Sequence, residues 1–145
     1  MQIEIKIDSS CTDPKIIVLT DKMTDEINSI IRKLYEESPQ LLSGFREDTI
    51  EILEQADIIR IYSALGKVFA VTNNGEYTLR LRLYELEERL VTSGFVRISN
   101  SEIINLKKVK GFDLSFSGTI CVTLYDGTVT YVSRRYVSKI KQVLG

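Results

Sequence analysis

Short alternating runs of apolar and polar residues, joined by glycine turns, constrain this chain more than any other feature. Residues 68–72 and 77–81 flank Asn73-Asn74-Gly75, and residues 120–124 and 129–131 flank Asp126-Gly127. Asn, Asp and Gly accept the positive φ angles that tight hairpin turns require, so both sites predict antiparallel hairpins. We therefore expect a mainly β fold, α+β overall, for residues 41–145.

Three segments have the helical period of 3.6 residues instead. The first is predicted over 21–38, with Thr20 or Asp21 as its N-cap, and it ends before Pro39 because the residue preceding proline avoids the helical region. The other two are short helices whose apolar faces are Leu83-Leu86-Leu90, closed by Ser93-Gly94, and Val137-Ile140-Leu144, begun after Ser133.

Residues 1–40 form an N-terminal extension with its own pattern. Ile3, Ile5 and Ile7 alternate with polar residues and predict a strand, and the run 16–19 predicts a second strand before the helix. A piece of about 40 residues cannot bury a core alone. It must therefore pack on the rest of the protein, on a second copy or on a partner.

Composition argues against an enzyme and against a metal or other cofactor. The chain has no histidine, and Cys11 and Cys121 form no CxxC pair, which removes the commonest zinc ligand and the usual nucleophile pairs. No apolar run reaches the roughly 18 residues of a membrane span, and the N-terminus lacks the apolar core of a signal peptide. A cytoplasmic location is expected.

Charge is distributed unevenly along the chain. From Phe95 onward there are eight Lys and Arg residues against three Asp and Glu, a net charge of +5, so the preceding 94 residues carry −6. Such asymmetry suggests that one end of the protein faces a polyanion and the other end has a different task.

The start of the last helix carries two arginines, Arg134 and Arg135, behind the predicted N-cap Ser133. Guanidinium groups beside free backbone N–H donors favour phosphate, and they can present a two-pronged donor to a guanine edge. A cation there opposes the helix dipole by about 0.3–1 kcal/mol, so stability alone does not select this pair. The alternative is a solvated surface pair.

A second cluster of candidates surrounds the turn after residue 98. It consists of Arg97, Ser99, Asn100 and Ser101, and an exposed Asn can hydrogen-bond adenine or phosphate. Asn and Ser are equally ordinary turn residues, so the alternative of a simple turn stays open. Further candidates for phosphate contacts, or for a merely wet strand face, are Lys107, Lys108 and Lys110. Lys67, beside Gly66, would by itself be an ordinary exposed turn residue.

Three stretches together resemble a known protein family. They are FVRISNSEIINLKKV (95–109), DGTVTYVSRRYV (126–137) and ADIIRIYSALGKVFAVTNNG (56–75), the last followed by LRLYELEERL (81–90). They resemble the LytTR DNA-binding domain of bacterial response regulators over about residues 41–145. The chain is most similar to stand-alone LytTR regulators, which carry a short strand-and-helix extension in front of that domain.

The resemblance implies an elongated antiparallel β-domain that inserts loops into successive major grooves, rather than a helix-turn-helix. It implies base contacts from Lys67, Asn100 and Arg135. The phosphate or supporting contacts that accompany them are Arg97, Ser99, Ser101, Lys107, Lys108, Ser133 and Arg134. Family members often have histidine or arginine where this chain has Ser99, and Asn105 matches a position that braces the loop.

Two functions from different classes therefore stand side by side. The first is a bacterial transcription regulator that binds double-stranded DNA as a homodimer on repeated half-sites. The alternative is a β-rich module for protein interaction or ligand binding, whose basic surface meets an acidic partner. No phosphoacceptor receiver domain fits into the first 40 residues. We expect the N-terminal helix to mediate self-association or to contact an inhibitory partner, which in stand-alone family members is often a small membrane protein.

Overall fold

The computed structural model describes residues 1–36 and 41–145, in two compact units, Met1–Pro39 and Gln40–Gly145. In the first unit, helix α1 covers Asp25–Glu36. Its N-cap is Thr24, whose hydroxyl accepts a hydrogen bond from the Ile27 N–H at 3.3 Å. Acidic residues in the first turn then complement the positive end of the helix dipole.

The predicted start of this helix, with Thr20 or Asp21 as the cap, was wrong. The Thr20 hydroxyl instead donates to the Lys22 carbonyl at 2.8 Å, which holds a local turn, and the helix begins four residues after Asp21. The predicted end at Ser38-Pro39 lies outside the described residues.

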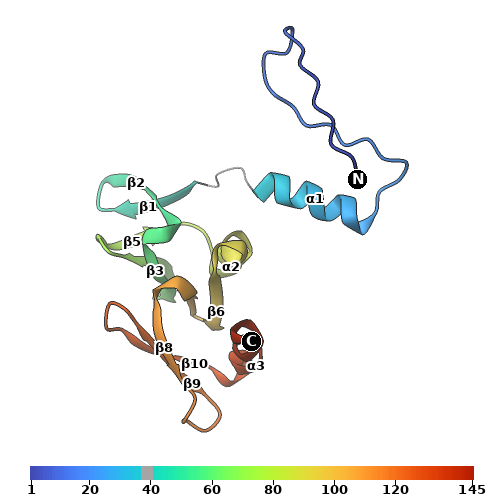
Figure 1. The fold of residues 1–145 in the computed structure, drawn as a ribbon. Coiled ribbons are helices and arrows are strands. Elements are labelled where there is room, and N and C mark those ends of the chain that lie inside the picture. Colours follow the sequence, from blue (N-terminus) through green and yellow to red (C-terminus); the bar gives the residue numbers. More distant parts are fainter. Residues whose placement is uncertain (37–40) are drawn as a thin grey trace. The chain divides into compact units, whose positions relative to one another are not determined.

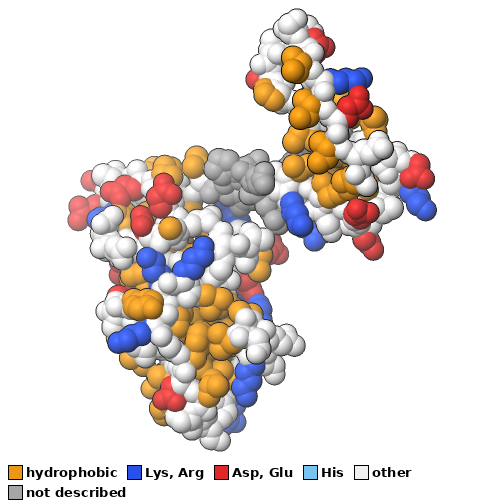
Figure 2. Space-filling view, viewed as in Figure 1, with side chains coloured by type: hydrophobic (Ala, Val, Ile, Leu, Met, Phe, Trp, Pro, Cys, Tyr) orange, Lys and Arg blue, Asp and Glu red, His pale blue; other side chains and the backbone are white. Residues whose placement is uncertain are grey.

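The two strands predicted in the N-terminal extension are not formed, which corrects the interpretation of residues 2–7 and 16–19. A strand needs a neighbour that takes up its backbone hydrogen bonds, and no strand pairs with either segment among the described residues. Ile3, Ile5 and Ile7 are consequently 84–98% exposed. Figure 2 shows such hydrophobic side chains on the surface of this unit.

The second unit contains ten strands and two helices within the described residues (Figure 1). The strands are β1 Leu42–Arg46, β2 Thr49–Leu53, β3 Ile58–Ala64, β4 Lys67–Thr72, β5 Gly75–Leu79, β6 Phe95–Ser99, β7 Glu102–Asn105, β8 Val109–Asp113, β9 Ile120–Leu124 and β10 Val129–Val132. The helices are α2 Leu83–Leu90 and α3 Arg134–Leu144. Among residues 1–36 and 41–145, no helix has the length and apolar character needed to cross a bilayer.

The strands form two antiparallel sheets. One has seven strands in the order β2-β1-β5-β4-β3-β7-β6, and the other has three in the order β10-β9-β8. Both predicted glycine hairpins are present: β4 pairs with β5 around Asn73-Asn74, and β9 pairs with β10 around Asp126-Gly127. The mainly β prediction for residues 41–145 is confirmed.

Two hydrophobic clusters form the core. The first packs α2 on the seven-stranded sheet through its predicted stripe, Leu83, Leu86 and Leu90. The second packs the three-stranded sheet and Ile140 of α3 against β6. Strand β6 lies between α2 and α3 in Figure 1, so the turn at its end is fixed by both clusters.

Candidate nucleic-acid interface

The turn that joins β6 to β7 holds Ser99, Asn100 and Ser101. The register of this hairpin shifts between Arg97 and Ser99, so the strand is irregular where the turn begins. The Ser101 N–H donates to the Ser99 Oγ at 3.2 Å, and the Ser101 carbonyl accepts from the Ser63 N–H of β3 at 2.9 Å. The turn is therefore tied to a central strand while Asn100 remains exposed.

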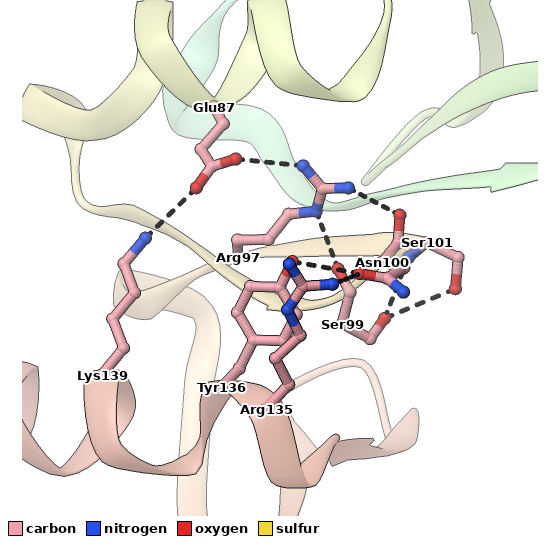
Figure 3. A network of polar contacts seen from close by, with 8 residues as sticks. All are labelled: Glu87, Arg97, Ser99, Asn100, Ser101, Arg135, Tyr136 and Lys139. Carbon is pink, nitrogen blue, oxygen red and sulfur yellow. Dashed lines mark hydrogen bonds and ion pairs between the residues drawn. The ribbon is translucent and has the colours of Figure 1, made fainter.

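The start of α3 lies beside this turn. Ser133 is at the N-cap position, as predicted, and its N–H donates to the Ile98 carbonyl of β6 at 2.9 Å, although its hydroxyl makes no capping bond. The Nη1 of Arg135 is 3.5 Å from the Oδ1 of Asn100, and the Tyr136 hydroxyl donates to the same oxygen at 3.2 Å. Two exposed side chains 35 positions apart in the chain thus lie next to each other (Figure 3).

The Arg97 side chain points toward the protein interior and bonds the backbone of the turn. Its Nε donates to the Ser99 carbonyl at 2.7 Å and its Nη2 to the Asn100 carbonyl at 2.6 Å, while Nη1 forms an ion pair with Glu87 at 3.0 Å (Figure 3). The side chain is only 13% exposed. Of the two roles predicted for Arg97, the geometry fits support of the turn rather than contact with phosphate.

A hollow of about 530 Å³ connects this turn to the start of β4. Lys67, at that start, is exposed and lines the hollow together with Asn100 and Arg97. Two further basic residues, Arg80 and Arg82, lie along the same wall between β5 and α2. All three residues predicted to contact bases therefore lie at one connected surface.

The other candidate cations lie elsewhere on the domain. Lys107 and Lys108 follow β7, at the end of the β6–β7 hairpin opposite to Asn100. The Arg134 guanidinium covers Gly118, where an added Cβ would come within 3.0 Å of its Nε. These three residues are exposed or half-exposed, but the structure does not bring them to the Asn100 turn.

Two buried polar residues connect the β6–β7 hairpin to neighbouring strands. Asn105 is 1% exposed; its amide donates to the Ile58 carbonyl at 2.8 Å and accepts from the Lys107 N–H at 3.0 Å. Glu102, directly after the turn, pairs with Arg60 of β3 at 2.7 Å and accepts from Thr130 of β10 at 2.6 Å. Asn105 therefore holds the end of β7 to β3, at the end of the hairpin opposite the Asn100 turn, and Glu102 joins the two sheets.

Tyr62 supports the neighbouring strand β3. Its hydroxyl donates to the carboxylate of Glu76, and this hydrogen bond raises the pKa of the phenol above its usual value. The phenol therefore keeps its proton, and its bond between β3 and β5, to a higher pH than an ordinary tyrosine does. Its ring stacks on Phe69 with centroids 5.2 Å apart.

Five residues of this surface were missed by sequence reasoning. They are Arg80, Arg82, Glu87, Tyr136 and Lys139. Arg82 and Lys139 could have been suspected from charge, and Tyr136 from its place beside the arginines. Glu87 gives no signal, because it is one of several acidic residues in a short amphipathic helix and its partners are 10 and 52 positions away.

The fold and the surface together define a class: a β-domain that presents an amide, guanidinium groups and a lysine at the ends of strands. The family model described as the LytTr DNA-binding domain matches residues 48–145. The chain therefore belongs to the LytTR family, and residues 48–145 are its DNA-binding domain.

Individual relatives agree with this membership. An uncharacterised HTH-type transcriptional regulator of Staphylococcus aureus strain NCTC 8325 is 35% identical over 145 residues, covering 99% of this chain and 98% of that protein. The corresponding regulator of strain MRSA252 is 34% identical over the same length. The similarity thus includes the N-terminal extension.

A solved structure has the same fold. It is a LytTr DNA-binding domain from Bacillus cereus, with a TM-score of 0.71 and 19% identity, and the match covers 74% of this chain and 99% of that one. A helix-turn-helix, which the names of the relatives mention, needs two helices joined by a short turn. In the described part of this chain, strands separate α1 from α2 and α2 from α3.

Proposed function

We propose that this protein regulates transcription by reading the major groove of double-stranded DNA with Asn100 and Arg135. The observation that carries the proposal is the exposed pair itself, with its polar groups 3.5 Å apart on a turn and a helix start. An amide can bond adenine at two atoms, and a guanidinium can bond guanine at two atoms. A pair this close suits neighbouring base pairs within one groove.

Lys67 is the third proposed base contact, in an adjacent groove. It stands across the hollow from Asn100, on a different strand and loop. Arg80 and Arg82 line the same hollow, which suits contact with the phosphates of the intervening backbone. Ser99, Ser101, Ser133 and Arg134 remain proposed supporting contacts.

Salt dependence tests this proposal against the alternative of an acidic protein partner. A domain that neutralises about five phosphates is expected to lose duplex affinity with a log-log salt slope of about −4 to −5. Fluorescence anisotropy on a selected and a scrambled duplex, from low to moderate salt, measures both slope and preference. A steep slope without any preference between duplexes would favour a general polyanion binder.

We further propose that residues 1–40 join two copies of the chain, so that two domains engage repeated half-sites. Two arguments support a second copy as the partner. The apolar residues Ile3, Ile5 and Ile7 are exposed and have no partner strand among the described residues. An antiparallel pairing of residues 3–7 about Ile5 would place Glu4 opposite Lys6 of the other copy on one face, and isoleucines opposite isoleucines on the other.

Removing residues 1–40 is expected to convert a dimer into a monomer, as measured by light scattering, and to weaken binding to a duplex with two half-sites. Binding to a single half-site should change little. The isolated domain is expected to fold, because a solved domain of the same fold covers only the corresponding part. An unchanged oligomeric state and unchanged regulation would remove both self-association and a membrane-protein partner as roles for this segment.

The charge pattern offers a sharper control. In the symmetric pairing, position 4 of each copy faces Lys6 of the other. Glu4→Lys therefore creates two pairs of like charges and is expected to weaken the dimer. The double variant Glu4→Lys/Lys6→Glu restores opposite charges and is expected to recover it. Equal behaviour of the single and double variants would contradict this register.

A further inference from the structure

The half-buried Glu87 of α2 forms ion pairs with two cations from different elements. Its Oε2 lies 3.0 Å from Nη1 of Arg97 on β6, and its Oε1 lies 3.1 Å from Nζ of Lys139 on α3 (Figure 3). The Glu87 and Arg97 side chains are 32% and 13% exposed, so this pair is partly withdrawn from solvent. Both carboxylate oxygens are therefore used within the protein.

The first partner of Glu87 controls the Asn100 turn. Arg97 uses its two remaining nitrogens to hold the carbonyls of Ser99 and Asn100 at 2.7 and 2.6 Å. The guanidinium is rigid and planar, so fixing Nη1 on Glu87 also fixes the direction in which the other two nitrogens point. Arg97 thereby fixes the position of the Asn100 backbone relative to helix α2.

The second partner lies on the helix that carries Arg135. Lys139 is four residues after Arg135, and residues with this spacing lie on the same face of a helix. Arg135 and Tyr136 in turn contact the Oδ1 of Asn100 at 3.5 and 3.2 Å. The contacts therefore close a ring that runs from Glu87 through Arg97 to Asn100, across to α3, and back through Lys139.

We propose that Glu87 is a positioning residue that sets the distance between Asn100 and Arg135 before DNA arrives. This inference rests on the function proposed above. A carboxylate close to a DNA-binding surface repels phosphates, so simple electrostatics predicts that its removal strengthens binding to every duplex. The positioning role predicts instead a loss of discrimination between duplexes.

Glu87→Gln tests the two expectations, with Glu88→Gln as the matched control. Glu88 is the next residue on α2, is exposed, and forms no ion pair or side-chain hydrogen bond within the described residues. Both variants remove one negative charge at nearly the same place. We expect Glu87→Gln to lower the ratio of affinities for the selected and scrambled duplexes by roughly three- to tenfold. Glu88→Gln should keep the ratio and raise both affinities slightly.

Amide hydrogen exchange in the DNA-free protein gives a second readout. Glu87→Gln should speed exchange at residues 99–101 relative to Glu88→Gln, with equal exchange in strand β4. An unchanged ratio of affinities, or exchange equal to that of the control, would overturn the positioning role. If the unmodified protein prefers no duplex, the proposed function fails, and the exchange measurement alone then decides whether Glu87 holds the turn.

Discussion

Replacement of Arg135 by alanine is expected to weaken binding to the selected duplex by about 1–3 kcal/mol and to change binding to a scrambled duplex much less. Arg135 is exposed at the start of α3, and its guanidinium lies 3.5 Å from the exposed amide of Asn100. A contact that reads a base edge contributes only where the right base is present. Titration of both duplexes at one salt concentration measures the difference.

Arg134→Ala is the matched control, because it removes a side chain of the same type from the same turn of α3. Arg134 covers Gly118 and, within the described part of the chain, forms no hydrogen bond to the Asn100 turn. Its loss is expected to weaken binding to both duplexes by a similar, smaller amount, as for a phosphate contact. If Arg135→Ala left the preference between duplexes intact, Arg135 would not be a base-reading residue.

Replacement of Asn105 by alanine is expected to lower the free energy of unfolding by about 2–4 kcal/mol. The side chain is 1% exposed and satisfies the Ile58 carbonyl and the Lys107 N–H. A buried polar group left without a partner costs about 1–3 kcal/mol, and this substitution leaves the buried Ile58 carbonyl and the half-buried Lys107 N–H without theirs. Urea denaturation measures the change.

Asn100→Ala provides the comparison within the same hairpin. Asn100 is exposed, so its truncation should change stability by no more than about 0.5 kcal/mol while removing DNA preference. Equal losses of stability in the two variants would contradict the division between a bracing asparagine and a reading asparagine.

Local chemistry explains which parts of the fold could be predicted. The turns at Asn73-Asn74-Gly75 and Asp126-Gly127 specify their own hairpins, and the leucine stripe of α2 is spaced for one buried face. The prediction of two N-terminal strands was wrong for the opposite reason, because strand formation depends on a distant partner. Alternation at residues 3–7 describes a strand only when a partner strand is present, and the described part of a single chain supplies none.

The residues of the proposed site could be named from the sequence, but their arrangement in space could not. Arg135 could be singled out from its residue type, because an arginine at a helix start opposes the helix dipole. Asn100 by itself is an ordinary turn residue, and the resemblance to the LytTR family singled it out. Their proximity comes from the packing of α3 against β6 and from the Ser133 to Ile98 hydrogen bond between these distant segments. Arg97 was grouped with the possible phosphate contacts because its charge is visible in the sequence, whereas its partners Glu87 and the turn carbonyls are not.

Selection of bound duplexes from a random pool, carried out in parallel with the unmodified protein, Asn100→Ala and Arg135→Ala, tests the central claim most directly. We expect the unmodified protein to select a repeated motif. Each variant should lose base preference at one position of every half-site, and this position should differ between the two variants. A pool without enrichment, or the same motif from all three proteins, would contradict the claim that these two side chains read the bases.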